Sequence, residues 1–222
     1  MAIVTISRQY GSGGSEVAER VARALGWRLY DNAVVEEVAQ RLRMTPAEVS
    51  AREERVPSLA ERLTSAMSLG TPEYVPVISA VPAPPFEDRI VEVTRQIVQR
   101  AIAEGPLVVV GRGAQAMLAE RRDALHVFCY APRDALVQRV ADRERLSPAD
   151  AERLVADRNS QREQYVKRHW QRSWLAHEHY HACVNTAWLG IEGAAEVVIR
   201  LARDRFERAL DAAAESERRG SP

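Results

Sequence analysis

A cluster of glycines near the N-terminus has the residue types and spacing needed to bind a phosphate group. It lies in Tyr10–Ser15 (YGSGGS), between an apolar run at 2–7 and a helical pattern at 16–25. Glycines in such a loop let successive backbone N–H groups point at an anion, beside the partial positive charge of a helix N-terminus. The same glycines would also suit a tight strand-to-helix turn without a ligand, so the loop alone leaves both interpretations open.

The loop lacks the lysine of the standard phosphate-binding pattern. That pattern ends in Gly-Lys-Ser or Gly-Lys-Thr, and Gly13–Ser15 stands in its place here. The hydroxyl group of Ser15 is available for Mg²⁺, but no ammonium group would bridge the phosphates. Lys167 is the only lysine in the chain. The nearest replacements for the missing charge are therefore Arg8, just before the loop, and Arg112.

The segments around the loop alternate between predicted strands and helices. Apolar runs predict strands at 2–7, 27–30, 107–110, 125–130 and 182–185. Helical spacing and N-cap signals predict helices at 16–25, 32–42, from 45, at 58–68, 88–104, 132–145, from 147, and at 192–210. This alternation predicts an α/β fold with a mainly parallel sheet and helices on both faces. Ligands bind beyond the carboxyl ends of such strands, where the glycine loop, Gly111–Gly113 and Asn185–Thr186 are expected.

Composition argues against several classes of partner. The chain has 31 basic and 31 acidic residues, so no global charge indicates a nucleic acid polymer or an anionic membrane as partner. No stretch approaches the roughly 20 apolar residues that span a bilayer, and no secretory pattern opens the sequence, so we expect a cytoplasmic protein. Cys129 and Cys183 lie in apolar segments and are expected to be buried, reduced thiols.

Histidines and tryptophans in the second half of the chain offer further candidate ligands. Alternating histidines in His177–His181 would point to one face of an extended segment, as a metal site could use. The alternative is a polar loop that leads into the strand at 182. Trp170, Trp174 and Trp188 could stack on a base, but we expect them to pack against the core.

The order of these motifs resembles that of the cytidylate kinase-like P-loop proteins. The matching segments are Ile6–Gly14 (ISRQYGSGG), Leu25–Asp31 (LGWRLYD), Val108–Gly113 (VVVGRG), Ala131–Arg133 (APR) and Val184–Thr186 (VNT) followed by Leu189–Glu192 (LGIE). Proteins of this family often carry the same lysine-free loop. The resemblance extends from residue 3 to about residue 201, which is nearly the whole chain.

The resemblance implies a three-layer P-loop kinase fold with a helical lid. A single domain would span 1–211, with an acceptor-side helical insert and a proline-rich loop at about 32–86. The lid would lie at about 148–176, and a charged tail would follow at 212–222. Closure of such a lid excludes water from the site and prevents wasteful hydrolysis.

The resemblance also implies phosphoryl transfer from ATP to a nucleoside monophosphate, with Mg²⁺ and with CMP or dCMP as the default acceptor. Catalysis of this reaction depends on positioning and charge neutralisation, so it needs phosphate cradles and arginines. The predicted catalytic residues are Arg8, Arg112, Arg158 and Arg162. The predicted nucleotide-binding residues are Gly11, Ser12, Gly13, Gly14 and Ser15, with Ser15 also on Mg²⁺. The predicted acceptor-binding residues are Asp31, Arg112 and Asp157. Small-molecule nucleotides are the expected partners, and a homodimer is left open.

Departures from the family pattern affect the predicted acceptor. Cytidylate kinases hold the acceptor phosphate with an arginine where this chain has Glu36 and Glu37. Their Gly-Arg-Asp after the central strand becomes Gly111–Gly113, which keeps the arginine and loses the carboxylate that helps to read the base. His181 stands where the family usually has an aspartate. Two alternatives to a cytidylate kinase follow: a catalytically weak or inactive nucleotide-binding regulatory protein, and a kinase of another small molecule.

Overall fold

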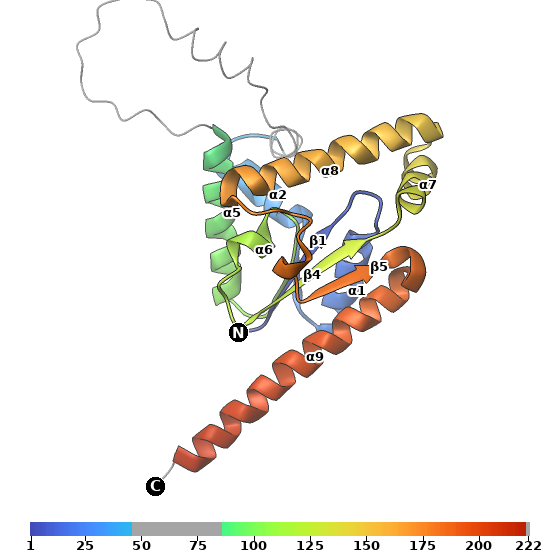
Figure 1. Ribbon diagram of the computed structural model, residues 1–222. Coiled ribbons are helices and arrows are strands. Elements are labelled where there is room, and N and C mark those ends of the chain that lie inside the picture. The colour runs from blue at the N-terminus through green and yellow to red at the C-terminus, as the bar shows by residue number, and fades with distance from the viewer. Residues whose placement is uncertain (46–85, 221–222) are drawn as a thin grey trace, which may run out of the picture.

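The computed structural model describes residues 1–45 and 86–220 (Figure 1). The elements in chain order are β1 (Ile3–Arg8), α1 (Gly14–Leu25), β2 (Arg28–Tyr30), α2 (Asn32–Leu42), α5 (Phe86–Ala103), β3 (Leu107–Val110), α6 (Ala114–Met117), β4 (Ala124–Tyr130), α7 (Arg133–Glu144), α8 (Pro148–Trp170), a 3₁₀ turn (His177–His179), β5 (Ala182–Asn185) and α9 (Thr186–Gly220). The helix predicted at 58–68, nearly all of the helix predicted from 45, and the proline-rich loop lie outside the described residues.

The strands form one parallel sheet in the order β2-β3-β1-β4-β5. The central strand β1 pairs with β3 on one side and with β4 on the other, so that Thr5 is flanked by Val109 and His126. Parallel neighbours require crossover connections, which the helices supply. The sequence-based expectation of an α/β fold with a parallel sheet is confirmed, and each predicted strand is found to within one residue at either end.

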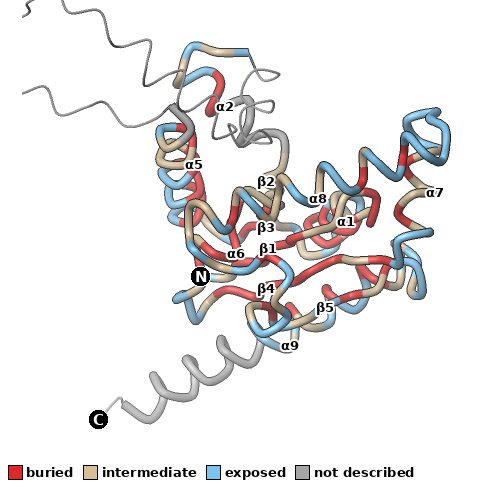
Figure 2. Tube along the Cα trace, turned by 45° about the horizontal axis from the view of Figure 1, so that its top comes forward, coloured by how far each residue is buried: buried red, intermediate tan, exposed pale blue. Residues whose placement is uncertain are grey.

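Helices cover both faces of the sheet, and in Figure 2 the tubes of β1, β3 and β4 are coloured mostly as buried. On one face, β1 residues such as Val4 and Ile6 pack with the buried sides of α1 and α9. On the other face, Ile3 packs with α5 and α6, and Phe128 of β4 packs with α6 and α8. Successive strand residues alternate between the two faces. The fold therefore has three layers.

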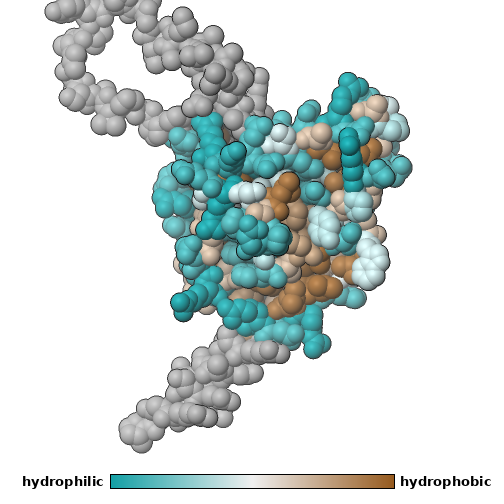
Figure 3. All heavy atoms as spheres, viewed as in Figure 1, coloured by the Kyte–Doolittle hydropathy of each residue, from teal (hydrophilic) through white to brown (hydrophobic). Residues whose placement is uncertain are grey.

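The helix α8 occupies most of the segment predicted as the lid, 148–176, as one continuous element. Ser147 caps it, because its Oγ accepts a hydrogen bond from the backbone N–H of Asp150 at 3.2 Å, as the sequence predicted. α8 packs on α7 and returns across the molecule toward α5 (Figure 1). Its middle therefore faces the loop that follows β1. In Figure 3, hydrophobic surface gathers between α8 and α9 on the face that is viewed there.

The last helix is longer than the sequence indicated. The sequence predicted a helix at 192–210 and a charged tail, whereas α9 runs from Thr186 to Gly220 and is interrupted at Gly190, where φ is 70°. Asn185 caps its start, because the side-chain oxygen accepts hydrogen bonds from the backbone N–H groups of Ala187 and Trp188 at 3.0 and 3.2 Å. The early start was missed because Gly190 interrupts the helical pattern.

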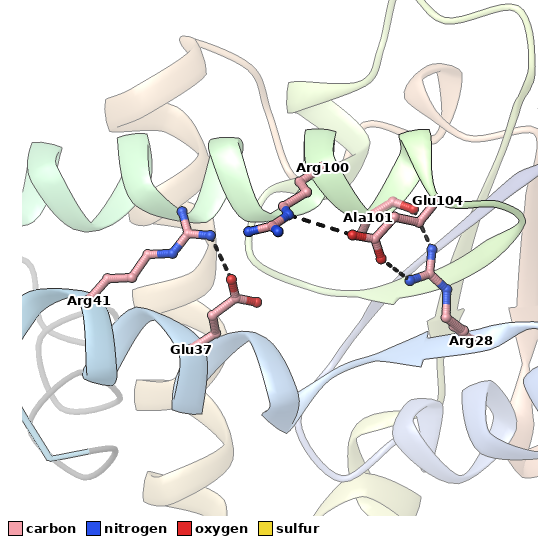
Figure 4. Close-up of polar contacts among 6 residues, drawn as sticks. All are labelled: Arg28, Glu37, Arg41, Arg100, Ala101 and Glu104. Carbon is pink, nitrogen blue, oxygen red and sulfur yellow. Dashed lines mark hydrogen bonds and ion pairs between the residues drawn. The ribbon is translucent and has the colours of Figure 1, made fainter.

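A side-chain contact fastens the edge strand β2 to α5 (Figure 4). The guanidinium group of Arg28 donates to Glu104 Oε2 and to the carbonyl oxygen of Ala101, each at 2.5 Å. Arg100 Nε lies 3.5 Å from Glu104 Oε1. Ion pairs exposed to solvent contribute only about 0–1 kcal/mol each. These contacts therefore matter chiefly for the position of β2, whose end leads to Asp31.

The charge of Glu37 is paired within α2. Arg41 Nη2 lies 2.6 Å from Glu37 Oε1, one helical turn away (Figure 4). Glu37 stands where cytidylate kinases have an arginine for the acceptor phosphate. Because its carboxylate is paired with Arg41, it would repel an acceptor anion less strongly than an unpaired carboxylate would. The side chain of Glu36 lies outside what the structure describes.

Two burial predictions are wrong. Cys129 is buried and Cys183 is exposed, both as free thiols. The difference arises because β5 is an edge strand, on which Cys183 alternates with the buried Val184. Trp188 is 83% exposed, since it lies in the short first part of α9, whereas Trp174 is 5% exposed. Among the described residues, no helix has the length and apolarity needed to cross a membrane.

Candidate functional site

The loop between β1 and α1 packs too closely for side chains at two of its glycines. Gly11 has a φ of +83°, and a Cβ there would lie 2.8 Å from the carbonyl oxygen of Leu136 on α7. A Cβ on Gly14 would lie 2.4 Å from the Cβ of Arg8. Such separations are not tolerated without movement of the backbone. These positions therefore need glycine because neighbouring segments pack against them, as well as because the chain turns there.

The loop lines a cavity of about 270 Å³, here called the loop cavity. The first hydrogen bond of α1 runs from the N–H of Val17 to the carbonyl oxygen of Gly13 at 3.0 Å, so the preceding N–H groups of the first turn have no intrahelical partner. The lining residues are Arg8, Gln9, Tyr10, Gly11, Gly13, Gly14, Ser15, Glu16, Glu19, Arg143 and Arg162. Four of the five predicted nucleotide-binding residues are thus together at one helix N-terminus.

Ser12, the fifth, is buried and supports the loop from behind. Its Oγ donates to the carbonyl oxygen of Gln9 at 2.8 Å. Its own carbonyl oxygen accepts hydrogen bonds from Thr186 Oγ1 at 2.6 Å and from Arg139 Nη1 at 3.1 Å. Thr186, expected at the ligand-binding edge, therefore ties the loop to the start of α9. Arg139 is a supporting residue that the sequence did not reveal.

Three of the four predicted catalytic arginines meet where α8 crosses the loop. Arg8, Arg112 and Arg162 line one cavity, and Arg8 Nη2 lies 3.5 Å from Asp31 Oδ1. Burial lowers the pKa of all three, and the nearby charge of Arg8 lowers the pKa of Arg112 further, to about 10, and that of Arg162 to about 9. Arg112 and Arg162 therefore remain cationic at neutral pH. The attraction of Asp31 does not offset this burial and repulsion, so an anion would stabilise the cluster.

The cavity that these arginines line lies beneath α8 and is here called the α8 cavity. Its volume is about 90 Å³. Its lining residues are Ser7, Arg8, Gly111, Arg112, Gly113, Gln115, Ala116, Arg162, Tyr165, Val166, Trp174 and Tyr180. Comparison of the two cavities shows that Arg8 and Arg162 line both. These two side chains therefore stand between the cavities.

The turn after β3 presents Arg112 in a strained backbone conformation. Arg112 has a φ of 54°, in the left-handed region that non-glycine residues rarely adopt. A Cβ on the following Gly113 would lie 2.3 Å from the ring of Trp170. The indole ring therefore lies where the carboxylate of the family pattern would begin. This packing accounts for the glycine in physical terms.

Two hydrogen bonds join α8 to the loop. Asn159 Oδ1 accepts from the backbone N–H of Tyr10 at 2.8 Å, and Arg162 Nη1 donates to the carbonyl oxygen of Arg8 at 2.7 Å. The guanidinium groups of Arg143 and Arg162 also lie 5.0 and 5.5 Å from the centre of the Tyr10 ring, as in cation–π contacts. α8 is therefore positioned against the loop by specific contacts.

The other two predicted α8 residues lie outside both cavities. Arg158 is near enough to contribute to the lowered pKa of Arg162, but it lines neither cavity. Asp157 is exposed and also lines neither. The structure thus does not bring Asp157 to the arginine cluster. Asp31, by contrast, reaches Arg8.

Sequence reasoning missed several residues that line the cavities. They are Arg143 in the loop cavity and Gln115, Tyr165 and Tyr180 in the α8 cavity. A signal existed for Tyr165 alone, because Asn159, Arg162 and Tyr165 recur every three residues and therefore share one face of a helix. The others come from separate segments whose meeting has no local signature.

The histidine cluster does not form the extended segment that a metal site would need. His177–His179 is a 3₁₀ turn. His181 Nδ1 accepts a hydrogen bond from the backbone N–H of His126 at 2.9 Å, and the two rings stack at 5.0 Å. Burial lowers the pKa of His126 to about 4. Among the described residues, no group of three or more metal-binding side chains gathers.

The residues present fit a triphosphate and its Mg²⁺. The loop cavity offers a cradle that a Cβ would fill, the free N–H groups of a helix N-terminus, and the hydroxyl group of Ser15. Arg8 and Arg162 add positive charge where lysine is missing. These hydrogen-bond donors and positive charges are of the kind that bind a ligand with several negative charges.

Comparisons with known proteins agree with this geometry. Residues 3–187 match the cytidylate kinase-like family. A crystal structure of an uncharacterized protein from Eubacterium ventriosum has a TM-score of 0.66 at 18% identity, covering 91% of this chain and 98% of that one. Shikimate kinase from Bacteroides thetaiotaomicron has a TM-score of 0.50 at 15% identity, covering 90% and 97%. These similarities show the P-loop kinase fold. No curated protein matches the sequence.

Proposed function

The chain belongs to the cytidylate kinase-like family, and we propose that it transfers the γ-phosphoryl group of ATP to a nucleoside monophosphate, with CMP or dCMP as the first candidates. The observation that carries the proposal is that Arg8 and Arg162 line both cavities. A donor phosphate in the loop cavity and an acceptor phosphate in the α8 cavity would share the same pair of guanidinium groups. Phosphoryl transfer needs this kind of positioning and charge neutralisation.

The loop cavity would hold the donor. Backbone N–H groups at Gly13 and Gly14 and the N-terminus of α1 would bind phosphate oxygens, and Ser15 Oγ would bind Mg²⁺. When bound, Mg²⁺ neutralises phosphate charge. Arg8 would take the place of the missing lysine, since its side chain packs over Gly111 and extends into the cluster.

The arginines would act as preorganised donors. Arg162 is held by its hydrogen bond to the carbonyl oxygen of Arg8, and Arg8 is held by Asp31. Fixed donors that need no reorganisation stabilise the charge on a transferring phosphoryl group, and loss of one typically costs about 10²–10³-fold in rate. Arg112 would bind the acceptor phosphate from the other side of the α8 cavity.

One observation favours a second candidate, a kinase of another small molecule. The ring of Trp170 packs on Gly113 where cytidylate kinases have the carboxylate that helps to read the base. Cytosine would therefore lack that partner. A nucleotide-binding regulatory protein without transfer activity is the third candidate, and it is supported by the missing lysine.

Acceptor-dependent formation of ADP tests the proposal. ATP and Mg²⁺ are incubated with CMP, dCMP, UMP, AMP, GMP and a panel of small phosphate esters, each against an acceptor-free control. We expect turnover with a nucleoside monophosphate. Arg112→Ala should raise the KM for that acceptor at least roughly tenfold and leave the KM for ATP unchanged, because a charge-assisted hydrogen bond is lost on one side only.

The outcomes separate the three candidates. Turnover with a non-nucleotide ester alone would support the second. Binding of a non-hydrolysable ATP analogue without turnover of any acceptor would support the third and reject phosphoryl transfer.

A further inference from the structure

The hydroxyl group of Tyr165 is a buried donor that finds no hydrogen-bond partner within residues 1–45 and 86–220. Tyr165 lies on α8, three residues after Arg162, and lines the α8 cavity. Its hydroxyl oxygen is shielded from solvent and has no hydrogen-bond partner among the described residues. Buried polar groups are nearly always paired, because an unpaired one costs free energy on folding. An exception on a residue that lines a cavity calls for a ligand that completes the pairing.

The surroundings of this hydroxyl group identify the kind of ligand atom. Arg112 is close enough that its charge acts on Tyr165, and burial raises the pKa of Tyr165 to about 12, so the phenol is protonated and can donate. The guanidinium groups of Arg8, Arg112 and Arg162 are donors only. Four residues that carry donor groups line this one cavity, and together they favour an anionic oxygen, such as that of a phosphate group.

The position of Tyr165 separates its proposed ligand from a ligand of the loop cavity. Tyr165 and Arg112 line the α8 cavity and do not line the loop cavity. A triphosphate in the loop cavity would be held by the loop and by the shared arginines. The phenol is therefore placed for a second anion.

The rest of the α8 cavity limits what that anion is attached to. Its remaining wall includes the rings of Trp174 and Tyr180, whose own hydroxyl group already donates to the carbonyl oxygen of Trp174 at 2.8 Å. The volume of about 90 Å³ is well below the roughly 300–1,000 Å³ of pockets that enclose whole drug-sized ligands. The cavity therefore suits a phosphate group and the few atoms next to it.

We propose that Tyr165 determines acceptor specificity, by donating a hydrogen bond to an anionic oxygen of a phosphate monoester that lies beside Arg112 in the α8 cavity. Acceptors that already carry a phosphate group are selected over uncharged alcohols. The inference rests on the proposed function for the transfer step, but the binding step can be measured without it.

Tyr165→Phe removes the hydroxyl group and keeps the ring. Calorimetric titrations use CMP, inorganic phosphate, cytidine and a non-hydrolysable ATP analogue, with thermal unfolding measured alongside. Tyr130→Phe is the matched control, because Tyr130 is a partly buried tyrosine of β4 that lines neither cavity. A structural role and a binding role predict opposite shifts of the unfolding temperature.

We expect Tyr165→Phe to weaken binding of CMP about tenfold or more, as loss of a hydrogen bond to a charged group does, and to leave binding of the ATP analogue within about twofold. The unfolding temperature should stay the same or rise by about 2 °C, because an unpaired buried hydroxyl group is removed. Cytidine should bind neither the unsubstituted protein nor Tyr165→Phe. Tyr130→Phe should bind each ligand with the affinity of the unsubstituted protein.

If Tyr165→Phe and the unsubstituted protein bind CMP with equal affinity, and also bind phosphate with equal affinity, the inference is overturned. It is also overturned by an equally large loss for the ATP analogue, or by a lower unfolding temperature, which would assign Tyr165 to the donor or to the fold. If phosphate binds and depends on Tyr165 while CMP does not bind, the inference stands and the nucleotide acceptor of the proposed function fails.

Discussion

The two cavities at the carboxyl edge of the sheet are built differently. The loop cavity is lined mainly by one glycine-rich segment, residues 8–16, while the α8 cavity is lined by residues from β1, the turn after β3, α6, α8 and the segment before β5. A backbone cradle binds phosphate whatever is attached to it. Side chains from separate segments can distinguish one phosphate ester from another. The proposed function therefore assigns phosphate affinity to the first cavity and selectivity to the second.

Removal of Arg8 should affect both cavities and have the largest effect. Arg8→Ala is expected to lower kcat/KM about 10²–10³-fold, because a preorganised donor at the shared boundary is lost. Arg20→Ala is the control, since Arg20 is a half-buried residue of α1 that pairs with Glu192 and lines neither cavity. Steady-state kinetics with both substrates measure the effect. A loss below tenfold would mean that Arg8 does not replace the lysine.

Substitution of Gly11 should affect the loop cavity alone. Gly11→Ala places a Cβ at positive φ and against the carbonyl oxygen of Leu136, so the loop must move. We expect the affinity for an ATP analogue to fall at least about tenfold, with acceptor binding unchanged.

Gly26→Ala is the matched control for this change. Gly26 has a φ of 67° and nothing within 4 Å of an added Cβ, so it brings a similar backbone strain of about 1–2 kcal/mol without the contact. Equal effects of both variants on nucleotide binding would show that strain alone is responsible. Calorimetry and thermal unfolding of both variants separate the effect of backbone strain from the effect of the contact with Leu136.

Removal of the Asn159 side chain should have the smallest effect, because only one neutral hydrogen bond between α8 and the loop is lost. Asn159→Ala leaves the backbone N–H of Tyr10 without its acceptor. One neutral hydrogen bond contributes about 0.5–1.5 kcal/mol, so the KM for ATP should rise roughly fivefold. Asn159→Asp keeps an acceptor oxygen and should lose less. If both variants match the unsubstituted protein, α8 is positioned by Arg162 alone.

The sequence predicted the loop and the sheet for a local reason. Continuous apolar runs such as Leu107–Val110 are typical of strands buried on both faces of a sheet. The glycines Gly11–Gly14 lie between such a run and a helical pattern, so they predict a strand-to-helix loop. The last helix was predicted less well, because Gly190 hides the early start at Thr186. The exposure of Trp188 and of Cys183 depends on which strand and helix lie at the edge, which no local pattern reports.

By itself, the sequence determined a parallel α/β fold and a glycine loop without lysine, and it predicted a set of arginines to replace that lysine. Only the tertiary structure decided which of these meet: Arg8, Arg112 and Arg162 converge, while Asp157 remains exposed. It also brought Tyr165 to the same cavity and packed Trp170 on Gly113. The physical reason is that strand and helix periodicity are local properties. Which side chains share a cavity depends instead on how segments more than 100 residues apart pack together.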